Sequence, residues 1–246
     1  MTIPSIRVAD KTKAGFPGAA KTFFKQRYPF FQEGVVNSEL YISNFINKYE
    51  GSRILVVGGG PTTNWAKWDP SNYDYIFSCN HFFLHPTLSN IEVSFACLCP
   101  EVDVTSPPFL NYYNRFNTQF CIENPDTSND QIKYMMKLNK SRLSLAELRM
   151  KFKIGVTAHL MILATLFKPL SIDVVGMDGY PPNKQHKTDS NHSFQKGKIM
   201  GSLRHDHSMY VDHYTRLWNY LKEIGNVKYT NLGKGHPYNI SGTLNV

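Results

Sequence analysis

One short stretch, Arg53–Pro61, constrains the fold of this chain more than any other. Its apolar part, Ile54–Val57, is mostly β-branched, which is typical of a short strand buried on both faces. Three glycines at positions 58–60 and Pro61 follow at once, so the backbone must turn tightly and can approach other atoms closely. Thr62 and the two residues after it suit the capping of a helix. The stretch therefore predicts a strand–turn–helix unit.

This glycine turn has two interpretations. Backbone N–H groups and the positive end of a helix dipole point from such a turn toward an anion, commonly a phosphate. In the alternative, the glycines serve only to connect the strand to its helix, which we expect to run through Trp65 and Trp68. The pattern Gly58–Pro61 has the spacing of neither the P-loop nor the dinucleotide fingerprint, so it does not identify the ligand.

The composition limits the class of protein. A chain of 246 residues, 41% of them hydrophobic, can build a sizeable core. A formal net charge of +8 favours anionic partners such as nucleotides, phospholipids or anionic glycans. The basic residues are dispersed and form no recognised nucleic-acid-binding module, so we expect no nucleic-acid partner. The four cysteines contain no Cys-x-x-Cys pair, which disfavours zinc.

The first part of the chain differs from the rest. It shows no signal-peptide pattern, and no apolar run approaches the ~20 residues that span a bilayer, so we expect a cytoplasmic protein. Basic and aromatic residues alternate through Lys21–Phe31, which suits either peripheral contact with the inner face of the membrane or packing onto the main domain. Pro29 interrupts any long amphipathic helix there and favours packing.

We therefore divide the chain into an N-terminal extension, residues 1–50, and one domain, residues 51–246. The extension ends in a helix over 39–49 that leads into the first strand. Further strands are expected over residues 73–80, 91–99, 119–122, 171–176 and 227–232. Their spacing predicts an α/β fold: a single Rossmann-like domain with a mainly parallel sheet flanked by helices, plus a polar lid loop over about 181–206.

Ligands of parallel sheets gather at the carboxyl ends of the strands. Gly58, Asn80 and Cys99 would lie at this edge, and Asp178 and Tyr180 directly follow a later strand. In the lid, His186, His192 and His205 follow no metal-ligand spacing, so the segment is better interpreted as a basic cover over an anionic ligand. These positions predict a binding site at the carboxyl edge.

Several helical and loop segments complete the prediction. Gly155–Phe167 is apolar nearly all round and predicts a buried central helix whose first turn is a second candidate anion site. His159 within it is expected to be a core residue. Residues 130–140 are polar and predict a loop, and Ser144–Glu147 matches a capping box.

His207 opens a predicted helix that ends near Gly225. The positive end of the helix dipole disfavours an imidazolium there and favours a neutral ring that accepts a proton. Asp206 or Asp212 would orient the ring. The position suits a general base.

Five motifs occur in a fixed order: Gly58–Thr62, Ser78–Phe82, Ile154-Gly155, Val175–Tyr180 and His207–Asp212. Together they resemble the Gly-Asn-Gly-Pro-Ser, Arg-Cys-Asn-Gln-Phe, Ser-Gly, Ser-Gly-Ile-Asp-Phe-Tyr and His-Ser-x-x-x-Asp motifs of the bacterial lipooligosaccharide sialyltransferases of the Campylobacter type. The resemblance covers about Arg53 to Leu221. It departs from that family at Gly59 and Cys99, where the family has asparagines, and at Ile154, where it has a serine.

The resemblance implies a fold, a donor and catalytic roles. It implies that His207 is the general base, that Tyr180 binds the phosphate of the departing CMP, and that no metal or other cofactor is needed. The family's second phosphate-binding tyrosine is replaced by His186. The donor-binding residues that follow from the turns and strand ends are Gly58, Gly59, Gly60, Pro61, Thr62, Asn80, Cys99, Ile154, Gly155 and Asp178.

The function expected from the sequence is a glycosyltransferase that moves sialic acid or a related keto-sugar from a CMP-activated donor to a glycan acceptor. Residues 51–246 would form the nucleotide-sugar-binding catalytic domain. Two alternatives remain open: a magnesium-dependent phosphotransferase of the pterin pyrophosphokinase-like group, which usually needs several carboxylates, and a nucleotide-binding module without catalysis. Association into a homo-oligomer is also left open.

Overall fold

The computed structural model describes residues 5–9, 45–99, 102–123, 129–149, 155–179, 192–195, 207–237 and 239–243. The expected membrane segment Lys21–Phe31, the candidate site residues Ile154, Tyr180 and His186, and most of the expected lid lie outside these residues. No helix in the described parts of the chain combines the length and the apolar character needed to cross a bilayer.

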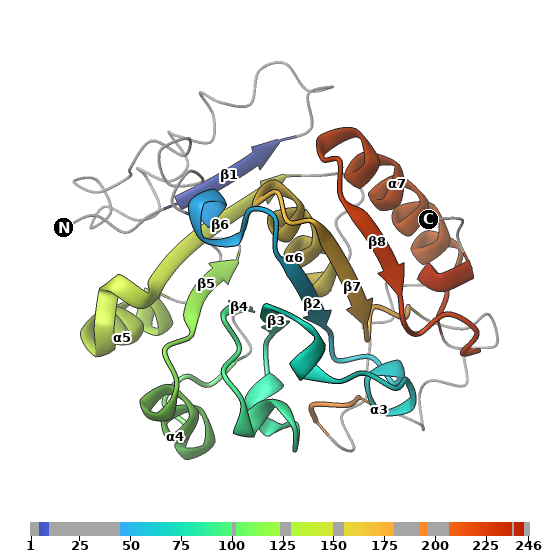
Figure 1. Ribbon diagram of the computed structural model, residues 1–246. Coiled ribbons are helices and arrows are strands. Elements are labelled where there is room, and N and C mark those ends of the chain that lie inside the picture. Colours follow the sequence, from blue (N-terminus) through green and yellow to red (C-terminus); the bar gives the residue numbers. More distant parts are fainter. Residues whose placement is uncertain are drawn as a thin grey trace.

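The centre of the fold is one sheet of eight strands, all paired in parallel, in the order β1-β6-β5-β4-β3-β2-β7-β8 (Figure 1). The strands are β1 Ser5–Ala9, β2 Arg53–Val57, β3 Tyr75–Cys79, β4 Phe95–Leu98, β5 Gln119–Glu123, β6 Leu143–Arg149, β7 Ser171–Val175 and β8 Lys228–Asn231. The predicted α/β fold with a parallel sheet is confirmed. The strand order reverses between β2 and β7, so the sheet has a topological switch point there.

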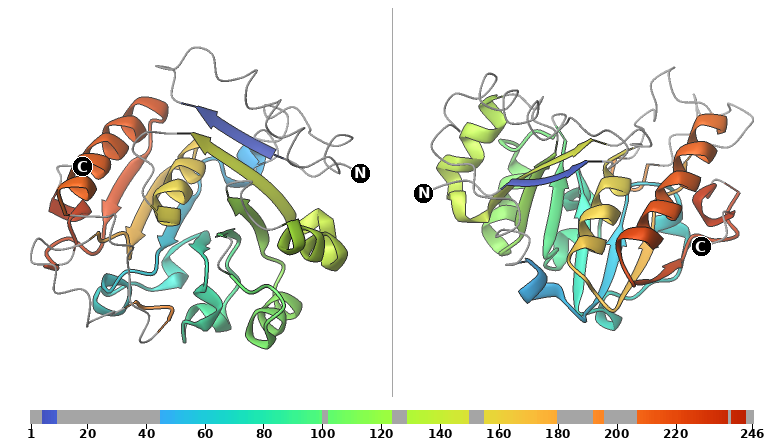
Figure 2. Two further views of the ribbon diagram at one scale, coloured as in Figure 1. Left: turned by 180° about the vertical axis from the view of Figure 1, so that it is seen from behind. Right: turned by 90° about the horizontal axis from the view of Figure 1, so that it is seen from above.

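The α-helices described are α3 Thr62–Trp65, α4 Pro107–Arg115, α5 Asn129–Asn139, α6 Gly155–Leu166 and α7 His207–Ile224. In Figure 2, α6 and α7 lie side by side on the sheet, and they contact each other. α4 packs on the opposite face, because its Phe109 and Tyr113 contact Phe120, whereas α6 contacts Cys79 on the other face through Thr157. Helices thus cover both faces of the sheet.

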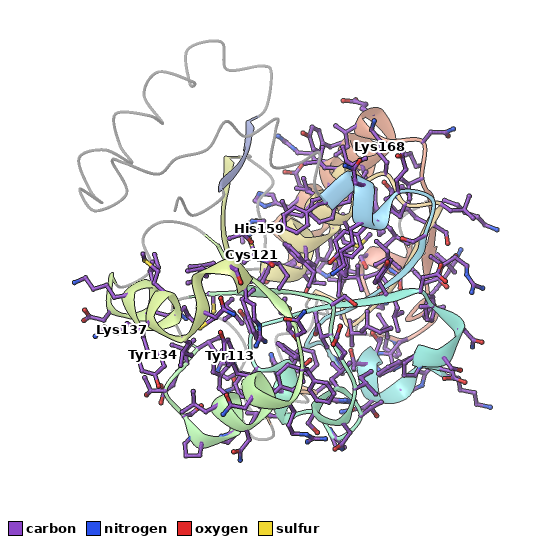
Figure 3. All side chains as sticks on the ribbon, turned by 60° about the vertical axis from the view of Figure 1, so that its left-hand side comes forward. Tyr113, Cys121, Tyr134, Lys137, His159 and Lys168 are labelled. Carbon is purple, nitrogen blue, oxygen red and sulfur yellow. The ribbon has the colours of Figure 1, made fainter. Side chains whose placement is uncertain are left out.

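An aromatic cluster joins the chain before β2 to the sheet. Residues 45–49 are helical, and Tyr49 contacts the rings of Phe77 and Phe167 with centroids 5.0 and 5.5 Å apart. Lys168, which follows α6, accepts a backbone hydrogen bond from Gly51 and lies near this cluster (Figure 3). The helix expected over 39–49 is therefore helical in its described part and is anchored by ring packing.

The predicted helices α6 and α7 are confirmed. All residues of α6 from Ala158 to Thr165 are buried, and His159, labelled in Figure 3, is only 3% exposed. Burial lowers the pKa of His159 to about 3, so this ring is a neutral core residue. In α7 the buried residues Tyr214, Leu217, Trp218 and Leu221 follow the spacing of one helix face.

Two local predictions were wrong. Residues 130–140 are mostly helix α5, not a loop, because Ile132 and Met135 are buried one helical turn apart while Lys133 is exposed. The capping-box pattern Ser144–Glu147 lies in strand β6, not at a helix start. β6 pairs with β1 on one side and β5 on the other, and this pairing outweighs a four-residue local signal.

Candidate functional site

The glycine turn joins the ends of β2 and β7, the two strands at the switch point. The Gly58 N–H donates to the Val175 carbonyl at 2.8 Å, and the Gly60 N–H donates to the Gly176 carbonyl at 3.0 Å. Two of the N–H groups expected to face an anion are therefore used to hold the turn against β7. The turn is part of the sheet's hydrogen-bonding system at its carboxyl edge.

Close packing explains two of the glycines. A Cβ on Gly58 would lie 2.5 Å from the Gly176 carbonyl oxygen and 2.6 Å from Thr157 Oγ1. A Cβ on Gly60 would overlap the carboxylate of Asp178. Both glycines are therefore required by packing, and whether the turn also binds a ligand stays a prediction.

Asp178, 3% exposed, is the anion at the start of α3. Its Oδ2 accepts from the Thr62 N–H at 2.9 Å, and its Oδ1 accepts from Thr62 Oγ1 at 2.6 Å. Thr62 Oγ1 in turn accepts from the Gly176 N–H at 2.9 Å. Burial raises the pKa of Asp178, and the hydrogen bonds from Thr62 and the nearby His236 oppose that rise.

The helix after the turn is shorter than expected. α3 ends at Trp65 instead of reaching Trp68, and its N-cap residue, Pro61, has no side chain that can accept a capping hydrogen bond. The expected capping hydroxyls bond elsewhere: Thr62 to Asp178, and Thr63 Oγ1 to the Gly58 carbonyl at 2.7 Å. The two threonines fasten the turn to its surroundings instead.

Asn80 and Cys99 lie side by side at the ends of β3 and β4. Asn80 has a φ of 50°, a conformation that asparagine tolerates better than most residues. Its Oδ1 accepts from the Cys99 N–H at 2.9 Å, and its own N–H donates to the Cys97 carbonyl at 2.8 Å. The amide oxygen therefore ties two strand ends together, and the amide N–H₂ is the part of Asn80 that can serve a ligand.

The first turn of α6 abuts the same edge. Thr157 Oγ1 lies 3.5 Å from Cys79 Sγ and directly beside Gly58. Gly155 is exposed and has a φ of 72°, and among the described residues no atom beyond its chain neighbours and its own helix lies within 4 Å of the position where a Cβ would stand. The site residues from β2, β3, β4, β7 and α6 are thus brought together at one edge.

A four-residue segment of the expected lid, His192–Gln195, lies on the glycine turn. The Ser193 N–H donates to the Gly59 carbonyl at 2.9 Å, and Ser193 Oγ donates to the Gly60 carbonyl at 2.7 Å. Phe194 is buried and contacts the ring of His85. The contact of this segment with the turn was not predicted. The feature of the sequence that could have indicated it is Phe194, a single aromatic residue among the mostly polar residues 181–206.

The start of α7 reaches the same edge of the sheet. Because α7 ends at Ile224 and β8 begins at Lys228, the helix runs antiparallel to β8 and starts at its carboxyl end (Figure 1). Its 18 residues span about 27 Å, about twice the length of four-residue β8. His207, the first residue, is partly buried there. Of the two carboxylates expected to orient it, Asp212 forms an ion pair with Arg216 at 3.0 Å, and Asp206 lies outside the described residues.

The C-terminal segment closes the edge beside Asp178, a feature that sequence reasoning missed. The Ile240 N–H donates to the Asp178 carbonyl at 2.7 Å, and Asn231 and Asn239 exchange a side-chain hydrogen bond of 2.9 Å. Trp65, 53% exposed, meets the ring of His236 edge-on with centroids 5.0 Å apart. Within the described residues no group of three or more His, Cys, Asp or Glu side chains could hold a metal ion.

The protein has an α/β fold with one parallel sheet. Its candidate site residues lie at the carboxyl edge of this sheet, which includes the topological switch point between β2 and β7. No family model and no curated protein matches the chain. Solved structures do. The monofunctional alpha-2,3-sialyltransferase Cst-I from Campylobacter jejuni is 15% identical, covers 80% of this chain and 83% of its own, and gives a TM-score of 0.52.

A second solved structure is similar to the same degree. It is a tyrosine-to-phenylalanine variant of the sialyltransferase Cst-II in complex with CMP, 14% identical, covering 77% of this chain and 87% of its own, with a TM-score of 0.50. At this level of identity the likeness establishes the fold: the chain has the fold of these sialyltransferases. The resemblance drawn from five sequence motifs is confirmed to that extent.

Proposed function

We propose that this protein is a glycosyltransferase that moves sialic acid or a related keto-sugar from a CMP-activated donor to a glycan acceptor. One observation carries the proposal. The turn after β2, Asn80 after β3, Cys99 after β4 and the first turn of α6 lie at one edge of the sheet, which contains the switch point, and α7 begins on the same side of the sheet. The same residues carry the motifs that resemble the sialyltransferases.

The proposed reaction is a substitution at the anomeric carbon of the donor sugar. His207 takes the proton of the acceptor hydroxyl, and the freed oxygen forms a bond to the anomeric carbon. The bond from that carbon to the phosphate oxygen breaks, and CMP leaves with the electron pair. His207 is the first residue of α7 and is partly buried, which suits a base positioned by the helix.

The leaving group needs hydrogen-bond donors as charge develops on its phosphate. Tyr180 and His186 are the proposed donors, and both lie outside the described residues. Asn80, Gly155 and the glycine turn are proposed to hold the nucleotide in line with the acceptor. Asp178 has both carboxylate oxygens bonded to Thr62, so its proposed role is to position the turn that holds the nucleotide.

The bonding of Asp178 also bears on the alternative phosphotransferase. Such an enzyme would need carboxylates free to coordinate magnesium, and the one carboxylate that the sequence offered at a strand end is buried and used internally. A metal-independent transfer is the better match to these residues. Peripheral membrane contact through Lys21–Phe31 and formation of a homo-oligomer stay predictions.

Thermal denaturation with a nucleotide panel tests the proposal. CMP at ~100 times its dissociation constant should stabilise the protein by roughly 2.7 kcal/mol, and a chelator should leave this shift unchanged. Stabilisation by ATP with magnesium but not by CMP would replace the proposal with the phosphotransferase. Transfer of the sugar from CMP-sialic acid to a labelled glycan would then separate an enzyme from a nucleotide-binding module.

A further inference from the structure

Trp65 is a large apolar side chain that stays exposed at the carboxyl edge of the sheet, with 53% of its surface open. The other two tryptophans of the chain are packed. Trp218 is 1% exposed, and Trp68 is partly buried, with its Nε1–H donating to the Thr63 carbonyl at 2.8 Å. A single exposed apolar side chain is common on protein surfaces, so the place of Trp65 in the fold decides whether it bears on function.

Trp65 lies at the topological switch point. It belongs to α3, which follows the turn after β2, and its ring meets the ring of His236, from the turn after β8, with planes at 69°. Figure 1 shows the ends of β2, β7 and β8 directed toward α3. Asp178, which follows β7 between these strands, has its carboxylate near His236. The two rings therefore bridge the point of the edge where ligands of such sheets bind.

The backbone that carries each of these rings is fixed. In the turn after β8, the Gly233 N–H donates to Asn231 Oδ1 at 3.0 Å. The His236 N–H donates to the Gly233 carbonyl at 3.1 Å, and the Asn239 N–H donates to the His236 carbonyl at 2.9 Å. Gly233 packs directly on the first residue of α3, because a Cβ there would lie 2.7 Å from Thr62 Oγ1. A surface that is ordered before binding loses less conformational entropy when a ligand arrives.

The two rings lie on the side of the edge that an acceptor must approach. α7 carries His207, the proposed base, and it packs against the C-terminal segment that follows the turn after β8. Tyr214 of α7 and Ile240 both stand beside Gly179, where a Cβ would lie 3.1 and 3.2 Å from them. Asn80, proposed to hold the nucleotide, follows β3, on the far side of β2 from β7 and β8. The order of the strands thus places the rings toward the base and away from Asn80.

We infer that Trp65 binds the acceptor glycan: its indole stacks on the C–H face of a hexopyranose ring of the acceptor. The inference rests on the proposed function and adds to it a contact for the acceptor. A hexopyranose has hydroxyls around its rim and mostly C–H groups on its faces. It can therefore lay a face on an aromatic ring while its hydroxyls stay in water. The competing occupant is the cytosine base of the donor, and the affinity for cytidine reports on it.

Three variants test this contact. Trp65→Ala removes the ring, and Trp65→Tyr keeps an aromatic face at the same position. Leu170→Ala is the matched control: it removes another exposed apolar side chain, 63% exposed, which precedes β7 at the opposite edge of the sheet. Loss of exposed apolar surface alone would affect Trp65→Ala and Leu170→Ala alike.

The full-length proteins, loaded with CMP, are applied to a printed panel of neutral oligosaccharides that end in hexopyranose rings. Calorimetry gives the affinities for CMP and cytidine, and thermal denaturation gives Tm. We expect Trp65→Ala to bind the glycans of the wild type about 10- to 100-fold more weakly, the range that removal of one stacking aromatic ring costs. Its KM for the best-bound glycan should rise to the same degree, with kcat and CMP affinity nearly unchanged. Trp65→Tyr should stay within several-fold of the wild type.

Four outcomes would overturn the inference, and they are distinguishable. If Trp65→Ala binds the glycans as well as the wild type does, the acceptor lies elsewhere and the proposed function stands. If Trp65→Ala instead loses affinity for CMP and cytidine, the ring stacks on the base, and donor binding stands. If the wild type binds CMP but no glycan of the panel, the acceptor contact is refuted and donor binding again stands. If the wild type binds neither CMP nor glycan, the proposed function fails and this inference fails with it.

Discussion

Two glycine segments at the carboxyl edge look alike in the sequence and differ in the structure. The turn at Gly58–Gly60 is filled by neighbouring protein atoms: Gly176, Thr157, Asp178 and His192 stand where side chains would be. Gly155, at the start of α6, is exposed, and no side chain of the described residues fills the space beside it. One glycine segment serves internal packing, and the other leaves room at the surface.

The difference shows that a glycine turn is not by itself evidence of a bound phosphate. At the packed side, the anion beside the turn is a residue of the protein, Asp178, and the turn's N–H groups have protein acceptors. At the open side, Gly155 and His207 each begin a helix, where N–H groups lack partners within the helix. We therefore expect changes at Gly58 and Asp178 to act mainly on stability, and changes at Gly155 and His207 to act mainly on ligand binding or turnover.

The largest expected effect is at the open side. His207→Ala and His207→Gln should each lower the transfer rate by ~10²–10⁴-fold, the usual contribution of a positioned acid–base group, with little change in CMP affinity. Turnover, CMP affinity and Tm are measured together. Ser208→Ala is the control for a role in starting the helix and should cost only stability. If the His207 variants are less stable yet nearly as active, His207 is not the base.

At the packed side, Gly58→Ala should destabilise the protein by about 1–3 kcal/mol, because the new methyl group meets a backbone carbonyl that cannot move aside. Chemical denaturation measures the change, and Tm should fall by several degrees. CMP affinity, measured at a temperature where the variant is folded, should change less than stability does. An unchanged unfolding midpoint would show that the turn has more room than its packing indicates.

The substitution Asp178→Asn tests the packed side through the pH dependence of stability. At pH 7 the substitution should lower the free energy of unfolding by about 1–3 kcal/mol, because one of the two Thr62 donors loses its acceptor. Burial raises the folded-state pKa of Asp178, so its folded form binds a proton more tightly than its unfolded form. The wild type should therefore gain stability relative to the variant as pH falls from 7 toward the unfolded pKa of about 4. A stability difference that stays constant with pH would contradict this.

The smallest effect is expected for a pair of glycine substitutions that distinguishes loss of stability through backbone strain from loss of CMP affinity. Gly155 and Gly51 have nearly the same φ, 72° and 73°. Within the described parts of the chain, a Cβ at either position would meet no atom within 4 Å, apart from those of the adjoining residues and, for Gly155, the backbone of its own helix. Replacement of either by alanine should cost about 1 kcal/mol through the left-handed backbone alone. Only Gly155→Ala should also weaken CMP binding. Equal CMP affinity in the two variants would place Gly155 outside the site.

Local patterns were enough to predict the central strands and the two long helices. β2, β4 and α6 are nearly continuous apolar runs. They are buried on all sides, so almost every residue in them must be apolar, and this pattern can be recognised in the sequence. β1, α4 and β6 were missed or assigned wrongly. β6 is defined mostly by its partners on either side, and a partner strand lies far away in the sequence.

For the site, the sequence by itself determined which residues stand at strand ends, since chain direction and strand spacing place Gly58, Asn80 and Asp178 at the same edge of a parallel sheet. Only the tertiary structure decided what those residues do there. Thr62 and Asp178 are 116 positions apart, and His192 reaches Gly59 from an even greater separation. Hydrogen bonds and excluded volume act between atoms a few ångströms apart, so whether a glycine makes room for a ligand or for the protein itself depends on contacts that no local pattern records.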